Sequence, residues 1–212
     1  MALPAFQPTF ASTNLIAPSF WDAFTDVVGT SLVAHVPTNA GQYWIPEGQS
    51  VATINPSGSL YQSIDSHPQN DMYAYPGPAS PDYTVTGIYQ NLSLPTHSYM
   101  LFGRAVQGLV MSGYRLETAP FGPEVDFFVG NTFIATVSSS FGGAIGPQYT
   151  MAMTFVNTVA GVVTQVFLNG VLSYTYTDAA NNYPLPGICG LGAGNQTDTA
   201  TTGSHWLFFS VV

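Results

Sequence analysis

The chain has 212 residues, of which 46% are hydrophobic and 14% aromatic, while only 6% are charged. This apolar content is enough to fill a core, which excludes a wholly disordered chain. Two Lys and Arg stand against eleven Asp and Glu, giving a formal net charge of −9. We therefore expect no nucleic-acid partner, because phosphate contacts need a basic face, and no docking on anionic membranes. Neutral Thr, Ser, Asn and Gln must cover the surface instead, which suits contacts with sugars or with neighbouring protein subunits.

Residues 1–21 differ from the rest of the chain. They are apolar, rich in Pro and Ala, and precede the first charged side chain, Asp22. Proline at three positions opposes both a helix and regular ladder pairing, so we predict an extended N-terminal arm. The arm is either a loose terminus or a segment that docks on the body or on a partner subunit. In the second interpretation, the docking side chains are Phe6, Phe10, Leu15 and Ile16.

From residue 22 to residue 212 the pattern is one of short strands and turns, and no window shows a helical period. Apolar and polar residues alternate in runs rich in β-branched and aromatic types, at 83–89, 113–118, 124–129, 149–157 and 162–168. Asn169-Gly170 lies between two such runs and predicts a tight hairpin, as does Gly130-Asn131. We therefore predict one all-β domain over 22–212, a two-sheet antiparallel sandwich.

The order of short motifs resembles that of concanavalin A-like jelly-roll domains. The motifs are Asp22-Ala-Phe, Gly29-Thr-Ser-Leu, His35-Val-Pro and Gly41-Gln-Tyr-Trp, followed in the second half by the Asn169-Gly170 hairpin and Gly187-Ile-Cys-Gly-Leu-Gly. The chain departs from that pattern near its end, where it has Trp206-Leu-Phe in place of Asp-x-Phe. The resemblance implies a jelly roll of two curved sheets. Members of this superfamily bind glycans, hydrolyse them, or serve as structural modules on bacteriophage particles, and the fold alone does not choose among these roles.

One segment resembles a catalytic motif. Glu124-Val-Asp-Phe-Phe-Val is similar to the Glu-x-Asp-x-Glu and Glu-x-Asp-x-x-Glu strands of laminarinase-type glucanases, but it has Phe128 and Val129 where the last carboxylate would stand. Retaining hydrolysis needs one carboxyl group as the nucleophile and a second as the acid/base. The carboxyl group that would donate the proton is absent from this motif, so we predict no enzymatic activity and no catalytic residue. A divergent hydrolase would need carboxylates from different strands facing one cleft, and the glutamates available are Glu47, Glu117 and Glu124.

The sequence predicts neither a cofactor nor a metal site. His35, His67, His97 and His205 are scattered and lack the spacing of metal ligands. We interpret His35 as a structural histidine. Cys189, the only cysteine, lies in an apolar run and is expected to be a buried, inert thiol.

Sugar binding is the chemistry for which the sequence does offer candidates. Aromatic rings stack on the apolar faces of sugars, and five aromatic residues lie in or beside predicted loops: Tyr43, Trp44, Tyr61, Tyr73 and Tyr75. The alternative is that these rings belong to the core of the sandwich. Both interpretations stay open at this point.

The function we predict from the sequence is a non-enzymatic structural or adhesion module of a virion. It would be a phage-like capsid decoration, spike or tail-associated protein on the virion surface, attached through its N-terminal arm. Its expected partners are other structural subunits, further copies of itself in a homo-oligomer, and a host surface glycan. The alternative is a free-standing, extracellular carbohydrate-binding module of a secreted protein.

Overall fold

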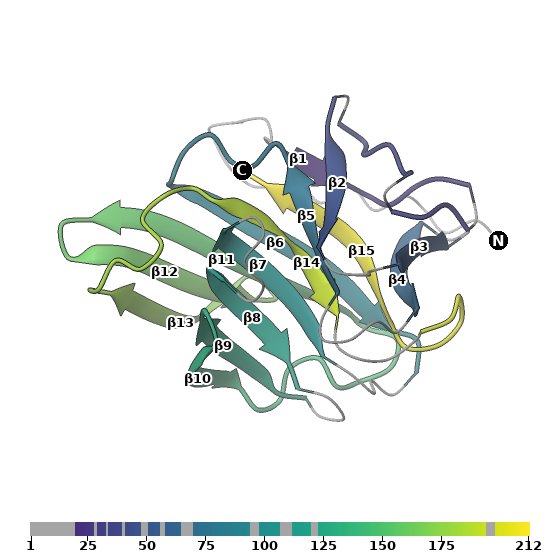
Figure 1. The fold of residues 1–212 in the computed structure, drawn as a ribbon. Coiled ribbons are helices and arrows are strands. Elements are labelled where there is room, and N and C mark those ends of the chain that lie inside the picture. Colours follow the sequence, from purple (N-terminus) through teal and green to yellow (C-terminus); the bar gives the residue numbers. More distant parts are fainter. Residues whose placement is uncertain are drawn as a thin grey trace.

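The protein is built from two antiparallel β-sheets that lie face to face (Figure 1). The computed structural model describes residues 20–27, 29–32, 34–39, 41–47, 51–55, 58–64, 70–93, 98–106, 112–119, 123–193 and 198–212. Within these ranges there are fifteen strands and no helix. The predicted all-β, two-sheet jelly-roll sandwich is confirmed, while Phe6, Phe10, Leu15 and Ile16 of the predicted arm lie outside the described residues.

The eight-stranded sheet has the order β13-β12-β11-β6-β15-β4-β3, with β1 paired to β15, and the seven-stranded sheet has the order β10-β9-β8-β7-β14-β5-β2. The strands are β1 (Phe20–Asp22), β2 (Tyr43–Glu47), β3 (Val51–Asn55), β4 (Ser59–Ile64), β5 (Asn70–Tyr75), β6 (Tyr83–Asn91), β7 (Tyr99–Ala105), β8 (Tyr114–Thr118), β9 (Val125–Val129), β10 (Thr132–Ser138), β11 (Gln148–Thr158), β12 (Gly161–Leu168), β13 (Val171–Asp178), β14 (Ile188–Ala193) and β15 (Ser204–Val211).

The two predicted hairpins are present. Asn169 and Gly170 join β12 to β13 with φ angles of 49° and 77°, the left-handed conformation that a two-residue hairpin turn requires at both positions. Gly130 and Asn131 join β9 to β10. The local turn chemistry therefore sets the pairing of one edge strand in each sheet, β13 and β10.

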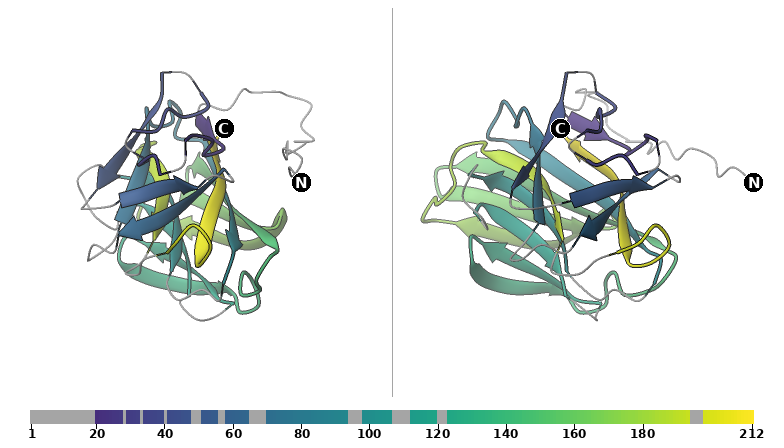
Figure 2. Two further views of the ribbon diagram at one scale, coloured as in Figure 1. Left: turned by 90° about the vertical axis from the view of Figure 1, so that its right-hand side faces the viewer. Right: turned by 45° about the vertical axis from the view of Figure 1, so that its right-hand side comes forward.

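Strand β1 brings the start of the described chain beside its end. Phe20 pairs with Val211 and Asp22 with Phe209, and the C-terminus lies next to β1 in Figures 1 and 2. Phe20 is only 1% exposed. Although the sequence placed Phe20 within the arm, it is thus a core residue of the sandwich.

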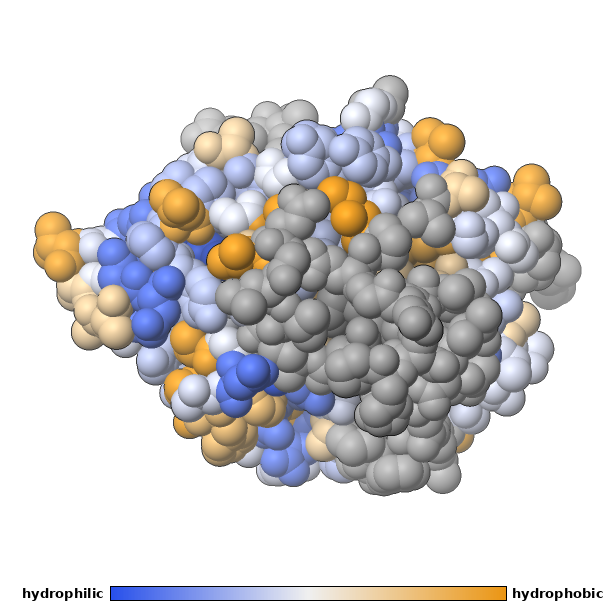
Figure 3. Space-filling model, viewed as in Figure 1, coloured by the Kyte–Doolittle hydropathy of each residue, from blue (hydrophilic) through white to orange (hydrophobic). Residues whose placement is uncertain are grey.

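The surface carries no arginine or lysine. The chain has only two such residues, Arg104 and Arg115, and they are 1% and 2% exposed. On the face shown in Figure 3, the coloured apolar residues lie singly or in small groups among neutral and hydrophilic ones.

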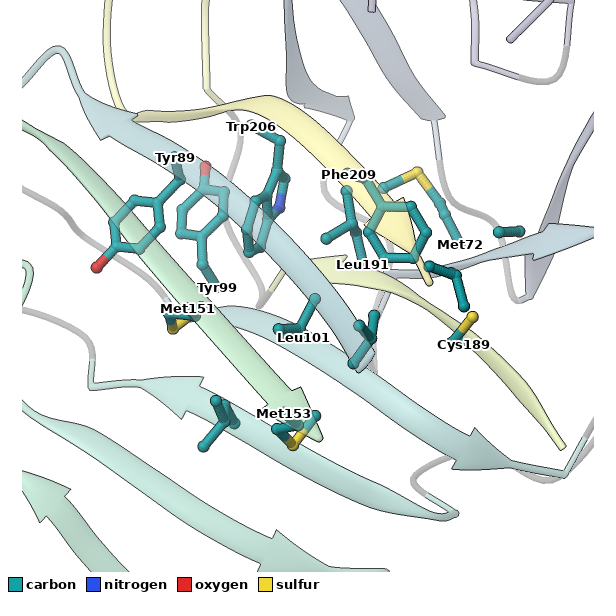
Figure 4. Packing of buried hydrophobic residues seen from close by; sticks show 14 of the residues in the cluster. Met72, Tyr89, Tyr99, Leu101, Met151, Met153, Cys189, Leu191, Trp206 and Phe209 are labelled. Atoms are coloured by element: carbon teal, nitrogen blue, oxygen red, sulfur yellow. The ribbon is translucent and has the colours of Figure 1, made fainter. Parts of the chain in front are cut away.

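The core fills the space between the sheets and is rich in aromatic side chains (Figure 4). Trp206 packs edge-on against Tyr89 and Tyr99, with ring centroids 5.6 and 5.9 Å away. Gly87 makes room for this indole, because a Cβ there would lie 2.5 Å from Trp206. Cys189 is fully buried, and burial raises the pKa of its thiol far above the ordinary range, so the prediction of a buried thiol is confirmed.

One hydrogen-bond network joins Asp22, His35 and Trp44, which belong to three of the short sequence motifs. His35 Nε2 lies 2.9 Å from Asp22 Oδ2, and its Nδ1 lies 3.0 Å from Asp26 Oδ2. The indole of Trp44 donates to Asp22 Oδ2 at 2.7 Å, and the backbone amide of Phe24 donates to Asp22 Oδ1 at 2.9 Å. His35 is therefore structural, as the sequence predicts, and it fastens the segment between β1 and β2 to the sheets.

Candidate functional site

The seven-stranded sheet has a second set of buried side chains on the face turned away from the core. Met72 and Leu101 belong to the core, whereas Tyr73, Met100 and Phe102 form a separate cluster. Neighbouring residues of a strand point to opposite faces of a sheet. The second cluster therefore defines the outer face of the seven-stranded sheet.

Two of the predicted aromatic residues meet on this outer face. Tyr75 follows Tyr73 by two residues and points the same way, and Tyr43 lies directly opposite Tyr75 on the edge strand β2. The ring centroids are 4.8 Å apart with an interplanar angle of 35°. Tyr43 is 48% and Tyr75 39% exposed. Of the twelve tyrosines, these two alone are classed as exposed.

Two other predicted sugar-stacking residues are not available to a ligand. Trp44 is 3% exposed and packs between Phe20 and Phe24. Tyr73 is 0% exposed and packs against Phe102. Their assignment to the sugar site is wrong, because Trp44 points into the core and Tyr73 joins the second buried cluster.

The fifth candidate, Tyr61, lies on a different sheet. It belongs to β4 of the eight-stranded sheet, is half-buried, and stacks on the imidazole of His205 with centroids 5.1 Å apart. The structure therefore does not bring Tyr61 together with Tyr43 and Tyr75.

The remnant of the glucanase-like motif lies at the other end of the outer face, on β9. Val125 and Phe127 point into the core, so Asp126 and Phe128 point outward. Thr136 of β10 donates from its hydroxyl to Glu124 Oε1 at 3.0 Å or to Asp126 Oδ1 at 2.8 Å. Burial raises the pKa of Asp126, and the neighbouring charge of Glu124 adds to the rise, while the Thr136 hydroxyl opposes it.

The adjacent strand β8 contributes Arg115, which the sequence did not single out, and Glu117, one of the glutamates named for a divergent hydrolase. Glu117 lies opposite Asp126, and Arg115 lies opposite Phe128. The guanidinium of Arg115 lies 4.3 Å from the centroid of the Phe128 ring, and its Nε donates to Glu117 Oε2 at 3.1 Å. Alternation along 114–118 puts Arg115 and Glu117 on one face, but the register that sets them against β9 is not visible in a single sequence.

No metal centre is formed by Glu117, Glu124 and Asp126. Among the residues that the structure describes, no group of three His, Cys, Asp or Glu side chains is arranged to hold a metal ion. The same part of the chain contains no helix long and apolar enough to cross a membrane.

The fold class is that of lectin-like, concanavalin A-like jelly rolls, with two antiparallel sheets of seven and eight strands. No family model matches the sequence, and no curated protein matches it. Solved structures with a similar fold include the carbohydrate recognition domain of Emp46p in its metal-free form, with a TM-score of 0.56 and 10% identity over 85% of this chain and 94% of that one.

Two further structures extend this likeness. The carbohydrate-binding module CBM66 from Bacillus subtilis has a TM-score of 0.51 and 14% identity over 78% of this chain and 91% of that one. Arcelin-5, a lectin-like defence protein from Phaseolus vulgaris, has a TM-score of 0.53 and 12% identity over 82% of this chain and 93% of that one. At this level of identity the likeness shows the fold, and any ligand must be argued from this chain's own residues.

Proposed function

We propose that the protein is a carbohydrate-binding module that contacts its glycan with the Tyr43–Tyr75 pair. The observation that carries this proposal is the exposure of two adjacent tyrosine rings, 48% and 39%, in a protein that keeps its other tyrosines at least half-buried. The fold it shares with carbohydrate recognition domains and with CBM66 adds support.

The chemistry of the pair fits a sugar. A tyrosine offers an apolar ring and a hydroxyl that both donates and accepts hydrogen bonds, and a sugar ring presents apolar C–H faces with hydroxyl groups at the rim. Tyr43 is on the edge strand, so a bound chain could extend past the sheet. Such a contact would leave little unpaired charge to desolvate, in keeping with a chain that is only 6% charged.

A glycan array followed by calorimetric titration of the best-binding glycan tests this proposal. The double variant Tyr43→Ser/Tyr75→Ser is expected to lose binding, and the variant Tyr43→Phe/Tyr75→Phe to keep most of it because the rings remain. Tyr61→Ser is the matched control, since Tyr61 is a partly exposed tyrosine on the other sheet. No glycan bound by the wild type, or equal binding by the Ser/Ser variant, would contradict the proposal.

A second candidate function, glycoside hydrolysis, is favoured by one observation. Glu117 and Asp126 come from different strands and face each other on the outer face, and Asp126 has a raised pKa, as a general acid does. Against hydrolysis, Glu117 is paired with Arg115, and Phe128 occupies the position of the third motif carboxylate. We therefore propose a non-enzymatic module. Reducing-sugar release from β-glucans by the wild type, abolished in both Glu117→Gln and Asp126→Asn, would overturn this choice.

Attachment to a virion or another particle through the N-terminal arm, as part of a homo-oligomer or with other structural subunits, remains a proposal that rests on the sequence of residues 1–21. This proposal is tested by deleting residues 1–18, a deletion that keeps the core residue Phe20. We expect the shortened chain to fold but to lose self-association or particle incorporation, as measured by light scattering and co-sedimentation. Unchanged self-association or particle incorporation would refute attachment through the arm.

A further inference from the structure

A pocket of about 450 Å³ opens where the edges of the two sheets meet. Strand β10 ends the seven-stranded sheet and β13 ends the eight-stranded sheet, and these two edge strands contact each other, as Figure 1 shows. The β9–β10 turn forms one wall and the loop over residues 179–187 forms another. The pocket is separate from Tyr43 and Tyr75, which lie on the strands at the opposite edge of the seven-stranded sheet.

The loop over 179–187 is held in place at its start by a buried carboxylate. Asp178 is 2% exposed and accepts hydrogen bonds from the backbone amide of Asn182 at 2.9 Å and from Asn182 Nδ2 at 3.1 Å. The hydroxyl of Tyr114 donates to the same carboxylate at 2.9 Å. This fixes the pocket-lining Asn182 against the body and leaves its Oδ1 free of partners among the described residues.

The rest of the loop is fastened through its backbone carbonyls. Three side chains of the body donate to three carbonyls of the loop: Arg104 to Tyr183 at 2.9 Å, Asn157 to Pro184 at 3.0 Å and Tyr83 to Pro186 at 3.1 Å. Arg104 and Tyr83 are buried. Because the loop is already ordered, a ligand would not have to supply the free energy of ordering it.

The pocket pairs two aromatic rings with neutral polar groups. Tyr176 packs on Phe127 with centroids 5.5 Å apart, and Tyr183 packs edge-on against Tyr114 at 5.7 Å. Among the described residues, neither tyrosine hydroxyl has a hydrogen-bond partner. Asn131 and Thr132 add an amide and a hydroxyl at the rim, while Val129 and Ile134 supply apolar walls.

We propose that this pocket is a binding site for one uncharged sugar unit of a saccharide. The rings of Tyr176 and Tyr183, which their neighbours hold in place, provide surfaces for the apolar faces of the sugar. The free amide and hydroxyl groups can form hydrogen bonds with the sugar hydroxyls. Apolar walls with a few well-placed polar groups, and a volume of this order, are typical of small-molecule sites. The proposal goes beyond the Tyr43–Tyr75 contact and does not depend on it.

The electrostatics of the pocket select against acidic sugars. No charged side chain lines it, and both arginines of the chain are buried. The carboxylate of Asp178 lies beneath it, and the chain has a net charge of −9. Burial, together with the charge of Asp178, raises the pKa of Tyr176, so its hydroxyl stays protonated and can donate. A carboxylated sugar would be repelled and would find no cation to pair with.

Saturation-transfer NMR and calorimetry test the proposal, with the methyl glycosides of glucose, galactose, mannose and N-acetylglucosamine as probes. Methyl glucuronide is the matched charged probe, since it differs from methyl glucoside only by its carboxylate. We expect at least one neutral probe to bind, and the corresponding acidic probe to bind at least about tenfold more weakly. Failure of every neutral probe to bind, or equal affinity for the glucuronide and the glucoside, would overturn the proposal.

The variants Tyr176→Leu and Tyr183→Leu locate the site. Each should weaken binding of the neutral probe by about tenfold or more, and Tyr176→Phe should restore most of the loss seen with Tyr176→Leu. Tyr174→Leu is the control, because Tyr174 is on the same strand and packs on the same Phe127 ring at 5.8 Å but does not line the pocket.

Two outcomes of the variant series are decisive. Binding that survives both pocket variants, or an equal loss in folded Tyr174→Leu protein, would refute the site. The pocket variants are also titrated in the Tyr43→Ser/Tyr75→Ser background, which lacks the Tyr43–Tyr75 contact, so that failure of this site and failure of the proposed function can be told apart.

Discussion

The hydroxyl of Thr136 contacts two carboxylates of the outer face. It is the hydrogen-bond donor that Glu124 and Asp126 share. Burial and the neighbouring carboxylate push the pKa of Asp126 upward, and the Thr136 hydrogen bond acts in the opposite direction because it favours the ionised form.

Replacing Thr136 with valine removes the hydroxyl and keeps the shape of the side chain. We expect the pKa of Asp126 to rise further in Thr136→Val, which a ¹³C-detected NMR titration of the carboxyl groups would measure. Ser138→Ala is a suitable control, since Ser138 is on the same strand but, among the described residues, its hydroxyl accepts a hydrogen bond only from the backbone amide of Ser140. A lowered or unchanged Asp126 pKa would show that the hydroxyl does not hold this carboxylate.

At the scale of elements, the segment between β1 and β2 depends on the charge of His35. Both ring nitrogens face carboxylates, which only accept hydrogen bonds, so the network is complete only when the imidazole is protonated. Burial lowers the pKa of His35, but the hydrogen bonds and charges of Asp22 and Asp26 outweigh it and leave the pKa above its usual value of 6.5.

A raised folded-state pKa means that the His35 network stabilises the protein fully below about pH 6.5, the unfolded value. This stability is lost as the pH rises through the higher folded-state pKa. Urea unfolding across this range should show the loss in the wild type and not in His35→Gln. His205 has the opposite effect on the pH dependence of stability. Burial lowers its pKa, so the stability that depends on its neutral imidazole is lost on acidification. A wild-type pH profile matched by His35→Gln would contradict this account.

The β12–β13 hairpin offers a second prediction at this scale. Gly170 has a φ of 77°, and a Cβ there would meet nothing within 4 Å. Gly170→Ala should therefore cost only backbone strain, about 1–2 kcal/mol, as measured by urea unfolding. Gly161→Ala should cost more, because its Cβ would also collide with the Asp178 carbonyl. Equal losses of unfolding free energy in the two variants would show that backbone strain alone sets the cost in both turns.

At the scale of the whole molecule, the charge distribution sets how stability responds to salt. The net charge is −9, and both arginines are buried, so surface carboxylates have few opposite charges to offset their mutual repulsion. Screening lengths fall from about 30 Å at 0.01 M salt to about 8 Å at 0.15 M.

We therefore expect the melting temperature to rise when NaCl is increased from about 0.01 M to about 0.15 M, because the added salt screens the repulsion between surface carboxylates. Calorimetry at pH 7 measures this change. Repeating it at a pH below the carboxyl pKa values is the control, and there the rise should vanish. A fall in melting temperature at pH 7 would contradict the picture of net repulsion.

Much of the architecture could be predicted from the sequence, because it depends on local rules. Period-two alternation marked β6, β8, β9, β11 and β12, and Asn169-Gly170 marked the hairpin, since only a few residue types accept a left-handed backbone. The buried state of Cys189 followed from its apolar neighbours in the chain, whereas the structural role of His35 was implied by its position in the jelly-roll-like motif.

The two proposed binding surfaces depend on the tertiary structure. Alternation could not say whether Trp44 or Tyr43 would face the core, and a shift of one residue would exchange them. The pairing of Glu117 with Asp126, and the meeting of Tyr176 with Tyr183 beside β10, join strands and loops through cross-strand register and sheet order. Those are long-range properties: they arise when two sheets bury a common core, and no local stretch of sequence encodes them.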